Sequence, residues 1–374
     1  MRSAPRSGPS TEPDPFWLSV LPGSLLAMTL AIDDDVFTAL VEPFRGELTA
    51  HCYRMLGSVH DAEDLVQETY LRAWRSYGKF EGRSSVRTWM YKIATNVCLT
   101  ALDGRARRPM PTGLGQPASD PRGALESRPE VTWLEPLPDA VVWGGRPDEP
   151  EATTLHRESV RLAFVAALQH LTPPQRAAVV LFDVLALQAS EVAELLDTSV
   201  AAVNSSLQRA RAHLAKLDPE ADAPVLDDAR KRALLAEYVD AFERYDIPRI
   251  VTLLSADAVW EMPPFAGWYT GAEEIGALIE TNCPAERPGD QILVEVSANG
   301  GPALALYMRD PADGVHRAFQ LQVPTVGAAA VTHVRVFFDT DLFARFGLPQ
   351  ELPAEHVARA RALEQEAGGG PAAE

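Results

Sequence analysis

The strongest constraint on the fold is a long interruption in the middle of the chain. Between about Asp103 and Glu151 the apolar periodicity disappears and prolines recur. Proline lacks the backbone N–H that helices and sheets use, so this segment predicts an irregular connection rather than a packed element. A chain of 374 residues is also too long for one ordinary domain. We therefore expect two or three folded units separated by a linker.

Helical periodicity dominates before the interruption. Asp33 to Leu56 predicts one helix, a second is predicted from Ser58 or Asp61 to Trp74, and Val86 to Leu102 predicts a third. Residues 77–85 are rich in glycine and serine, so they predict a loop. These segments predict a first all-α domain.

A second group of helices follows the interruption. Leu155 to Leu171 and Gln175 to Leu187 predict two helices, and the run 172–174, Thr-Pro-Pro, is a strong N-terminal cap signal between them. Ser190 to Leu196 and Val200 to Leu217 predict two more, joined by a short turn. Two helices around such a turn are typical of a helix-turn-helix.

The last of these helices has the surface that DNA recognition needs. Its predicted buried stripe is Val203, Leu207, Ala210 and Leu214. Small and polar side chains occupy the rest of the helix, and such a slim face enters a major groove and reaches base edges. The candidate contacts are Asn204, Ser205, Gln208, Arg209 and Arg211.

The net charge of −18 argues against a nucleic-acid partner only if the charge is evenly spread, and it is not. Residues 61–110 carry nine basic and six acidic residues, whereas residues 218–374 carry 12 basic and 26 acidic residues. The basic residues of the last helix would release about three counterions from DNA. The logarithm of the binding constant would then fall with the logarithm of the salt concentration at a slope of about −2.7. Because this is too weak for tight binding alone, we expect a dimer or a larger assembly.

A second basic site lies around the loop 77–85. Its cations are interleaved with aromatic residues, a combination that suits single-stranded DNA. The cations are Lys79, Arg83, Arg87 and Lys92, and the aromatic residues are Phe80, Trp89 and Tyr91. Helical spacing instead assigns Trp89, Ile93 and Val97 to the core. We therefore expect phosphate contact from the cations rather than stacking on Trp89.

Two separate motifs resemble the bacterial sigma-70 family in the order that the family uses. Residues 61–74, DAEDLVQETYLRAW, with residues 87–96, RTWMYKIATN, look like conserved region 2. Residues 172–217 look like region 4. The absence of a third sigma domain between them is similar to the extracytoplasmic-function group. Together these matches cover about half the chain, and they would explain the weak DNA contact, because sigma factors act within the RNA polymerase holoenzyme.

The resemblance implies a role for three sets of residues. The polymerase clamp helices would be met by Asp61, Glu63, Asp64, Gln67 and Glu68, which would otherwise be a solvated acidic face. The melted minus-ten strand would be bound by Arg83, Ser84, Ser85, Val86, Arg87, Lys92 and Asn96. The minus-thirty-five element would be contacted by the helix-turn-helix residues named above. Many relatives carry a basic residue where Asn204 stands, and this departure argues against phosphate anchoring by Asn204.

The C-terminal part predicts an α+β domain with an antiparallel sheet, because strands gather after helices. Leu234 to Leu254 and Ala272 to Thr281 predict its helices. Its predicted strands are Ala258 to Met262, Gln291 to Ser297, Ala303 to Arg309, Arg317 to Val323 and Val331 to Phe338. Residues 260–265, WEMPPF, and 267–271, GWYTG, resemble the cone-shaped SnoaL-like or NTF2-like domain, which some sigma factors carry as a regulator in cis.

Such a cone holds an apolar cavity, with ordinary core packing as the alternative for each residue. Candidate pocket residues are Trp260, Phe265, Trp268, Tyr269, Tyr307 and Phe319. Related folds include enzymes, and the acid–base candidates here are Asp257, Glu261, His316 and His333. No spacing singles out a pair, and we expect no catalytic activity.

These arguments predict a multidomain chain with two all-α domains and one α+β domain. The predicted boundaries are a disordered leader (1–32), region 2 (33–108), a Pro-rich linker (109–151), region 4 (152–217), a second linker (218–229), the SnoaL-like domain (230–346) and a tail (347–374). Trp133 and Trp143 are unusual in a passive tether and predict either local packing or docking on a partner.

The sequence also predicts the setting in which the chain works. Its three cysteines, Cys52, Cys98 and Cys283, are far apart, which favours a reducing cytoplasm and gives no zinc motif. Residues 16–32 are apolar, but Pro22-Gly23 interrupt them, so an unstructured leader or a start at Met28 is favoured over a signal peptide. We expect no cofactor, no metal and no membrane contact.

The predicted function is that of an alternative sigma factor with a fused regulatory domain. Its partners would be RNA polymerase core and promoter DNA, with an anti-sigma factor or a small-molecule ligand as a further candidate at the C-terminal domain. Two alternatives stay open. One is a stand-alone helix-turn-helix regulator with a ligand-binding domain, and the other is a SnoaL-like enzyme fused to a DNA-binding module.

Overall fold

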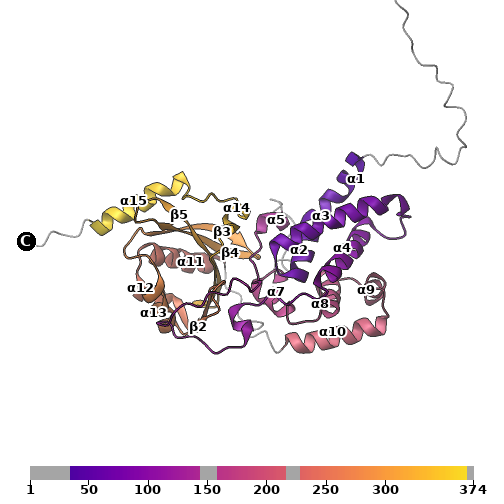
Figure 1. Cartoon of the computed structure of the whole chain (residues 1–374), viewed down its shortest axis with the longest axis horizontal. Helices are drawn as coiled ribbons and strands as arrows, with labels where there is room; N and C mark the ends of the chain where they lie inside the picture. Colours follow the sequence, from indigo (N-terminus) through magenta and orange to yellow (C-terminus); the bar gives the residue numbers. More distant parts are fainter. Residues whose placement is uncertain (1–33, 144–157, 216–227, 369–374) are drawn as a thin grey trace, which may run out of the picture. The chain divides into compact units, whose positions relative to one another are not determined.

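The computed structural model describes residues 34–143, 158–215 and 228–368 (Figure 1). The chain divides into two compact units, residues 1–42 and 43–374. The described part of the first unit consists of helix α1 (Asp34–Val41) and the first residue of a 3-10 turn, η3 (Glu42–Phe44). The predicted leader, 1–32, lies outside the described residues. The prediction of one helix from Asp33 to Leu56 is wrong, because Pro43 has no N–H to continue a helical ladder.

Three helices form the first helical domain. They are α2 (Arg45–Leu56), α3 (Val59–Ser76) and α4 (Val86–Leu102), with the 3-10 turn η4 (Tyr77–Lys79) after α3. Ser58 caps α3 by accepting from the Asp61 N–H at 3.1 Å, and Ser85 caps α4 by accepting from the Thr88 N–H at 3.0 Å. Gly57, in the left-handed conformation at φ 72°, ends α2 and lets the chain turn.

The second helical group contains the helix-turn-helix. Its helices are α7 (Leu162–Leu168), α8 (Pro173–Val179), the π-helical turn η6 (Val180–Val184), α9 (Ala189–Leu195) and α10 (Val200–Leu214). The predicted cap before α8 is confirmed, since Thr172 and Gln175 form a capping box. Within the described residues the first predicted helix is interrupted, because Ser159 and Val160 form a turn before α7, and residues 155–157 of the prediction lie outside the described residues.

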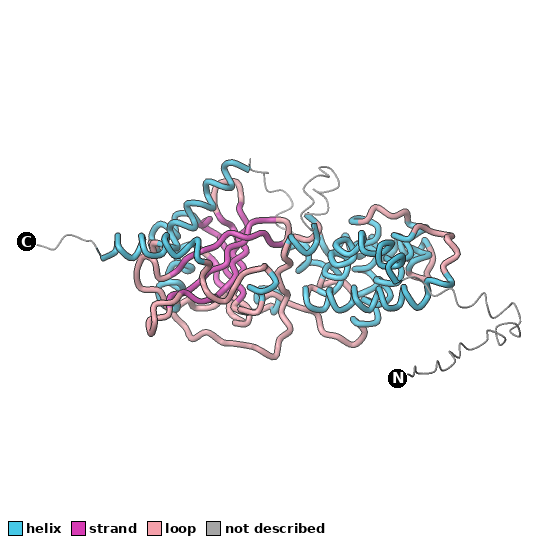
Figure 2. Tube along the Cα trace, turned by 90° about the horizontal axis from the view of Figure 1, so that it is seen from above, coloured by secondary structure: helices cyan, strands magenta, loops and turns pink. Residues whose placement is uncertain are grey.

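The C-terminal domain is built on one six-stranded sheet, drawn in magenta in Figure 2, with strand order β2-β1-β6-β5-β4-β3. The strands are β1 (Leu254–Glu261), β2 (Trp268–Thr270), β3 (Gln291–Ala298), β4 (Gly301–Arg309), β5 (His316–Val326) and β6 (Val331–Phe337). The predicted all-antiparallel sheet is wrong at one position, because β1 and β6 pair in parallel. No hairpin joins these two strands, so no tight turn imposes the antiparallel direction.

Helices α11 (Asp228–Glu243), α12 (Ile247–Leu253) and α13 (Ala272–Asn282) belong to the same domain as the sheet (Figure 1). Their apolar side chains are buried in one cluster with those of the sheet. The single helix predicted from Leu234 to Leu254 is two helices, because the chain turns at Tyr245, whose φ is 52°. Helix α14 (Leu342–Arg345) follows β6, and helix α15 (Ala354–Gly368) packs Ala360 and Leu363 against Ile292 of β3. Much of the predicted tail is therefore helical.

The Pro-rich linker is irregular, as predicted, but it is packed. It contains the 3-10 turn η5 (Pro111–Leu114) and the short helix α5 (Asp139–Trp143). Leu134 and Leu137 are fully buried, and Trp133 is 9% exposed, which favours local packing over a free tether. Residues 112–128, which we call the strap, run along the turn between β1 and β2. Main-chain bonds join Ser119 to Trp268 and Arg128 to Pro264, each at 2.8 Å.

Candidate polymerase and nucleic-acid interfaces

Helix α10 exposes most of the side chains predicted to contact duplex DNA. Val203, Leu207 and Ala210 are buried as predicted, so the outer face is turned away from the helix-turn-helix core. Along that face Asn204, Gln208, Arg209 and Arg211 are exposed and Ser205 is half-buried. The arginines are held in place, since Arg209 donates to the Ser205 hydroxyl at 2.6 Å and Arg211 pairs with Asp183. Asn204 and Gln208 therefore offer amide groups for base edges beside anchored cations.

The loop before α4 presents a small polar surface. Arg83, Ser84 and Ser85 are exposed, Val86 is half-buried, and Asn96 is exposed nearly three turns further along α4. A ring contact joins the loop to α4, because the ring centroids of Phe80 and Trp89 lie 4.8 Å apart. Trp89 is half-buried, in keeping with the expectation that it packs rather than stacks on bases.

Two cations of the predicted minus-ten set are already engaged within the protein. Arg87 pairs with Glu47 at 2.7 Å and lies over the ring of Tyr91. Lys92 donates to the backbone oxygen of Glu194 at 3.2 Å and lies 3.6 Å from the Asp197 carboxylate. Because Glu194 and Asp197 belong to the helix-turn-helix, Lys92 connects the two helical domains in this arrangement.

The predicted polymerase-binding side chains on α3 fall into two groups. Asp64 and Gln67 are exposed, and Glu68 pairs with Arg72 one turn away at 2.6 Å. Asp61 instead accepts from Arg105 and Arg108, which follow α4 at the end of region 2, at 3.1 and 2.8 Å. Glu63 pairs with Arg345, which lies on α14 of the C-terminal domain. The side of α3 that carries Asp61 and Glu63 is therefore occupied by other parts of the chain.

The six predicted pocket residues all make contacts within the core or with the linker. Trp260 and Tyr269 are buried in the main apolar cluster, and Phe265 and Phe319 pack against it. Tyr307 makes an edge contact with Phe343 of α14, and its hydroxyl donates to the Pro349 carbonyl oxygen at 2.9 Å. The remaining residue, Trp268, donates from its indole nitrogen to the strap residue Gln116 at 2.9 Å. Core and linker packing account for these contacts.

The structure brings together one pair of the acid–base candidates. His333 lies 2.7 Å from the Glu261 carboxylate, and Arg335 lies 3.1 Å from the other ring nitrogen of His333. Although burial raises the pKa of Glu261, the hydrogen bond and charge of His333 and the charge of Arg335 outweigh it and lower that pKa. Thr112 of the strap donates from both its N–H and its hydroxyl to the second oxygen of Glu261, at 3.1 and 3.2 Å. The strap thus occupies the open side of this carboxylate.

The other two candidates do not join that pair. Asp257 accepts from the Ser255 hydroxyl at 2.8 Å, and a ring nitrogen of His316 lies 2.7 Å from the Gly289 carbonyl oxygen. In the part of the chain that the structure describes, no group of three or more His, Cys, Asp or Glu side chains is placed to hold a metal ion. Cys52, Cys98 and Cys283 are free thiols. No described helix has the length and apolar character needed to cross a membrane.

Sequence reasoning missed the contacts that join the domains. Asn299, in the turn between β3 and β4, donates to the hydroxyl of Tyr53 in α2 and to the Val160 carbonyl oxygen, at 2.8 and 2.7 Å. Glu135 of the linker accepts from Ser58, from the Val59 N–H and from His60 at the start of α3. A single sequence holds only a weak signal for them, an Asn-Gly pair that predicts a tight turn.

Comparison with known proteins is consistent with this architecture. Residues 40–108 match the family model of Sigma-70 region 2, and residues 161–214 match that of Sigma-70, region 4. Over 320 residues the chain is 57% identical to the ECF RNA polymerase sigma factor SigG of Mycobacterium tuberculosis, covering 84% of this chain and 85% of SigG. The chain belongs to the ECF RNA polymerase sigma factors.

A second relative extends the comparison to a solved structure. The ECF RNA polymerase sigma factor SigJ of M. tuberculosis is 36% identical over 171 residues, which cover 46% of this chain and 47% of SigJ. The crystal structure of SigJ superposes with a TM-score of 0.55 at 22% identity and covers 84% of this chain and 99% of that one. This ECF sigma factor therefore has the predicted fold class, two all-α domains followed by an α+β domain.

Proposed function

We propose that this ECF sigma factor acts in the cytoplasm, where it binds RNA polymerase core and directs it to promoters through two separate surfaces. The observation that carries the proposal is the exposure of two polar surfaces, the outer face of α10 and the loop before α4. Each lies in a segment that matches a sigma region. The role of α10 is recognition of the minus-thirty-five element, with Asn204, Gln208 and Arg209 toward the DNA.

The loop before α4 captures the melted minus-ten strand. Arg83 supplies a cation that is 86% exposed in its side chain, although it pairs loosely with Glu81 at 3.1 Å. Ser84 and Ser85 are small enough to admit an unstacked base, and Asn96 supplies an amide further along α4. Arg87 and Lys92 join this surface only after their present partners, Glu47 and the Glu194–Asp197 turn, release them.

Core polymerase binds the outward side of α3, and the C-terminal domain limits access to it. Asp64 and Gln67 are open to a partner, whereas Glu63 is held by Arg345. Arg345 also donates to His60 at 3.0 Å, so two side chains of α3 lie against α14. We infer that the C-terminal domain regulates initiation in cis by covering part of the polymerase-binding surface.

The Glu261–His333 pair does not indicate a catalytic role. A general acid or base must reach a substrate proton, and the second oxygen of Glu261 is taken by Thr112. The pair instead ties the strap to the C-terminal domain. This supports a regulatory rather than an enzymatic domain.

In vitro transcription tests the proposal. The full-length protein is added to core polymerase with a library of promoter fragments, and open complexes are detected by permanganate reactivity of unpaired thymines. We expect promoter-dependent opening only when both proteins are present. A promoter shift by the protein alone, with no opening after core is added, would identify a stand-alone regulator.

A further inference from the structure

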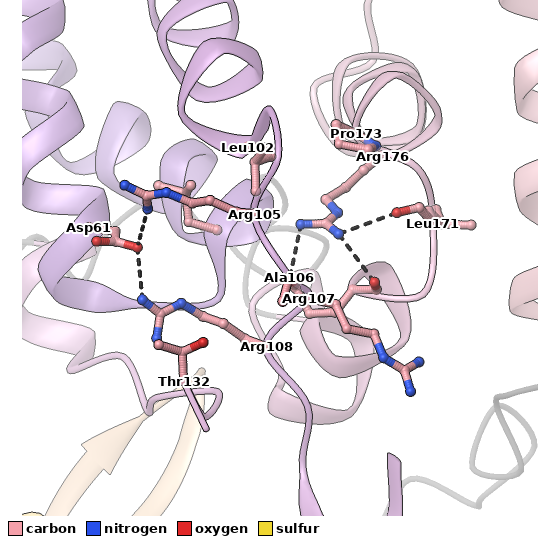
Figure 3. A pocket seen from close by; sticks show the side chains of 12 residues that line it. Asp61, Leu102, Arg105, Ala106, Arg107, Arg108, Thr132, Leu171, Pro173 and Arg176 are labelled. Atoms are coloured by element: carbon pink, nitrogen blue, oxygen red, sulfur yellow. Dashed lines mark hydrogen bonds and ion pairs between the residues drawn. The ribbon is translucent and has the colours of Figure 1, made fainter. Parts of the chain in front are cut away.

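A pocket of about 370 Å³ opens where region 2, the linker and region 4 meet (Figure 3). Of its lining residues, only Asp61 belongs to a predicted functional set, the polymerase-binding residues of α3. Its lining comes from all three parts: Leu56, Asp61, Leu102, Arg105, Ala106, Arg107, Arg108, Thr132, Gln169, Leu171, Pro173 and Arg176. Four of these residues are arginines and one is a carboxylate, so the lining carries an excess of positive charge.

The arginines fall into two pairs with different partners. Arg105 and Arg108 lie beside Asp61 and share its carboxylate (Figure 3). Arg107 donates to the Gly113 carbonyl oxygen at 2.7 Å and lies 2.7 Å from a ring nitrogen of His170. Within residues 34–143, 158–215 and 228–368, no carboxylate lies within ion-pair distance of Arg107 or Arg176. Half of the cations in the pocket therefore have only neutral partners.

Arg176 is the most unusual of the four. It is only 3% exposed, and its guanidinium donates to oxygens of Met55, Gln169 and Leu171. Its Nε has no hydrogen-bond partner among the described residues. Burial lowers the pKa of Arg176 to about 10, so the group stays protonated at neutral pH. A buried cation without a counter-charge is costly, and an anion in the pocket would reduce that cost.

The nearby arginines also affect the pKa of His170, which contacts Arg107. Burial and then the charges of Arg107, His213 and Arg176 lower the pKa of His170. The apolar residues Leu56, Leu102, Leu171 and Pro173 supply a wall beside the cations. Planar guanidinium groups bind phosphate oxygens in a bidentate way, and an apolar wall suits a base or another flat ring. The volume lies within the usual range for small-molecule sites, about 300–1,000 Å³.

We propose that this pocket binds a small phosphorylated molecule of nucleotide size. Its phosphate lies among Arg107, Arg105 and the buried Arg176, and its ring lies on the apolar wall. Since the pocket is built from region 2, the linker and region 4, the bound ligand holds these three parts together. Ligand binding therefore favours the present arrangement, in which Lys92 is attached to the helix-turn-helix.

Calorimetry on the full-length protein tests this site with two probes, inorganic pyrophosphate and ATP. Titrations are made at about 0.15 M salt without divalent cations, so that protein side chains supply the counter-charge. We expect saturable binding at one site per chain. Arg107→Ala changes an exposed position, so we expect it to keep the wild-type melting temperature and to weaken the binding of both probes about tenfold. Arg105→Ala is a second variant, and Arg122→Ala is the matched control because this exposed linker arginine lies outside the pocket.

Three results would overturn the proposal. The first is the absence of saturable binding of either probe at millimolar concentration. The second is equal weakening by Arg122→Ala, which would indicate nonspecific attraction to the linker. The third concerns the source of the phosphate: if a single-stranded promoter oligonucleotide binds in an Arg107-dependent way while pyrophosphate and ATP do not, the pocket holds the DNA backbone instead.

Discussion

The side-chain nitrogen of Asn299 donates a hydrogen bond to the hydroxyl oxygen of Tyr53 across 2.8 Å, and so joins the β3–β4 turn to helix α2. Burial raises the pKa of Tyr53, so its hydroxyl stays neutral and also donates to the Glu135 carbonyl oxygen at 2.6 Å. Asn299 further accepts from the Leu137 N–H at 2.9 Å. One buried amide thus joins region 2, the linker and the C-terminal domain.

Replacing that amide should loosen the linker. Asn299→Ala leaves buried partners unsatisfied, at a cost of about 1–3 kcal/mol, and places alanine at a φ of 55°. We expect proteolytic cleavage within residues 111–138 of the folded protein to rise about tenfold or more. Ser297→Ala, at an exposed position on the same hairpin, should leave the cleavage rate unchanged. An unchanged rate for Asn299→Ala would show that the hairpin does not hold the linker.

Releasing Glu63 should strengthen binding to core polymerase. The Arg345–Glu63 pair is partly exposed, so its loss is worth about 0.5–1 kcal/mol, or roughly two- to fivefold in affinity. We expect Arg345→Ala to bind core tighter by that factor in fluorescence anisotropy. Arg361→Ala, an exposed arginine on α15, serves as control. Weaker binding by Arg345→Ala would contradict the masking of α3.

Two substitutions on α10 should separate base readout from phosphate contact. Gln208→Ala removes an exposed amide, and we expect promoters to lose discrimination at one minus-thirty-five position by about 1–3 kcal/mol. Arg209→Ala should weaken holoenzyme binding to all promoters and reduce the salt slope by about 0.9. Titrations of holoenzyme against single-base promoter variants at several salt concentrations measure both effects. If Gln208→Ala weakened all promoters equally, its assignment to base readout would be wrong.

His51 should make region 2 sensitive to acid. Burial, and then the charge of Arg54, lowers its pKa from 6.5 to about 3, and its ring hydrogen-bonds Thr95 at 3.0 Å. Between pH 6.5 and pH 3 the unfolded chain therefore binds a proton at His51 that the folded chain does not bind. The free energy of unfolding is therefore highest above pH 6.5 and decreases as the pH falls. From pH 7 to pH 5 the expected loss is about 2 kcal/mol.

Denaturant titration of the region 2 transition at both pH values measures this loss. His51→Gln, which cannot titrate, should remove about 2 kcal/mol of the difference between pH 7 and pH 5, whatever its effect at either pH. His356→Gln, on α15, should leave the difference unchanged. A wild-type difference that persists in His51→Gln would assign the acid sensitivity to other groups.

Local sequence signals predicted most helices, strands and exposed faces. Thr172 marked the start of α8, and Val203 and Leu207 marked the buried stripe of α10, because caps and helical spacing act over a few residues. The parallel pairing of β1 with β6 had no such signal. The Arg345–Glu63 pair and the Thr112–Glu261 hydrogen bond had no local signal either. These contacts join residues far apart in the chain and depend on how the folded domains pack together.

Three of the bonds between the strap and residues 264–268 are made by main-chain atoms of the strap, the N–H groups of Ser119 and Arg128 and the carbonyl of Glu126, whereas Thr112 and Gln116 also use their side chains to bond to the C-terminal domain. Any residue but proline supplies a main-chain N–H, so substitutions along the strap preserve these ties. An insertion or deletion moves every later donor out of register. Over evolutionary time the strap should therefore keep its number of residues more strictly than its residue types, apart from Thr112 and Gln116, whose side chains bond to the C-terminal domain.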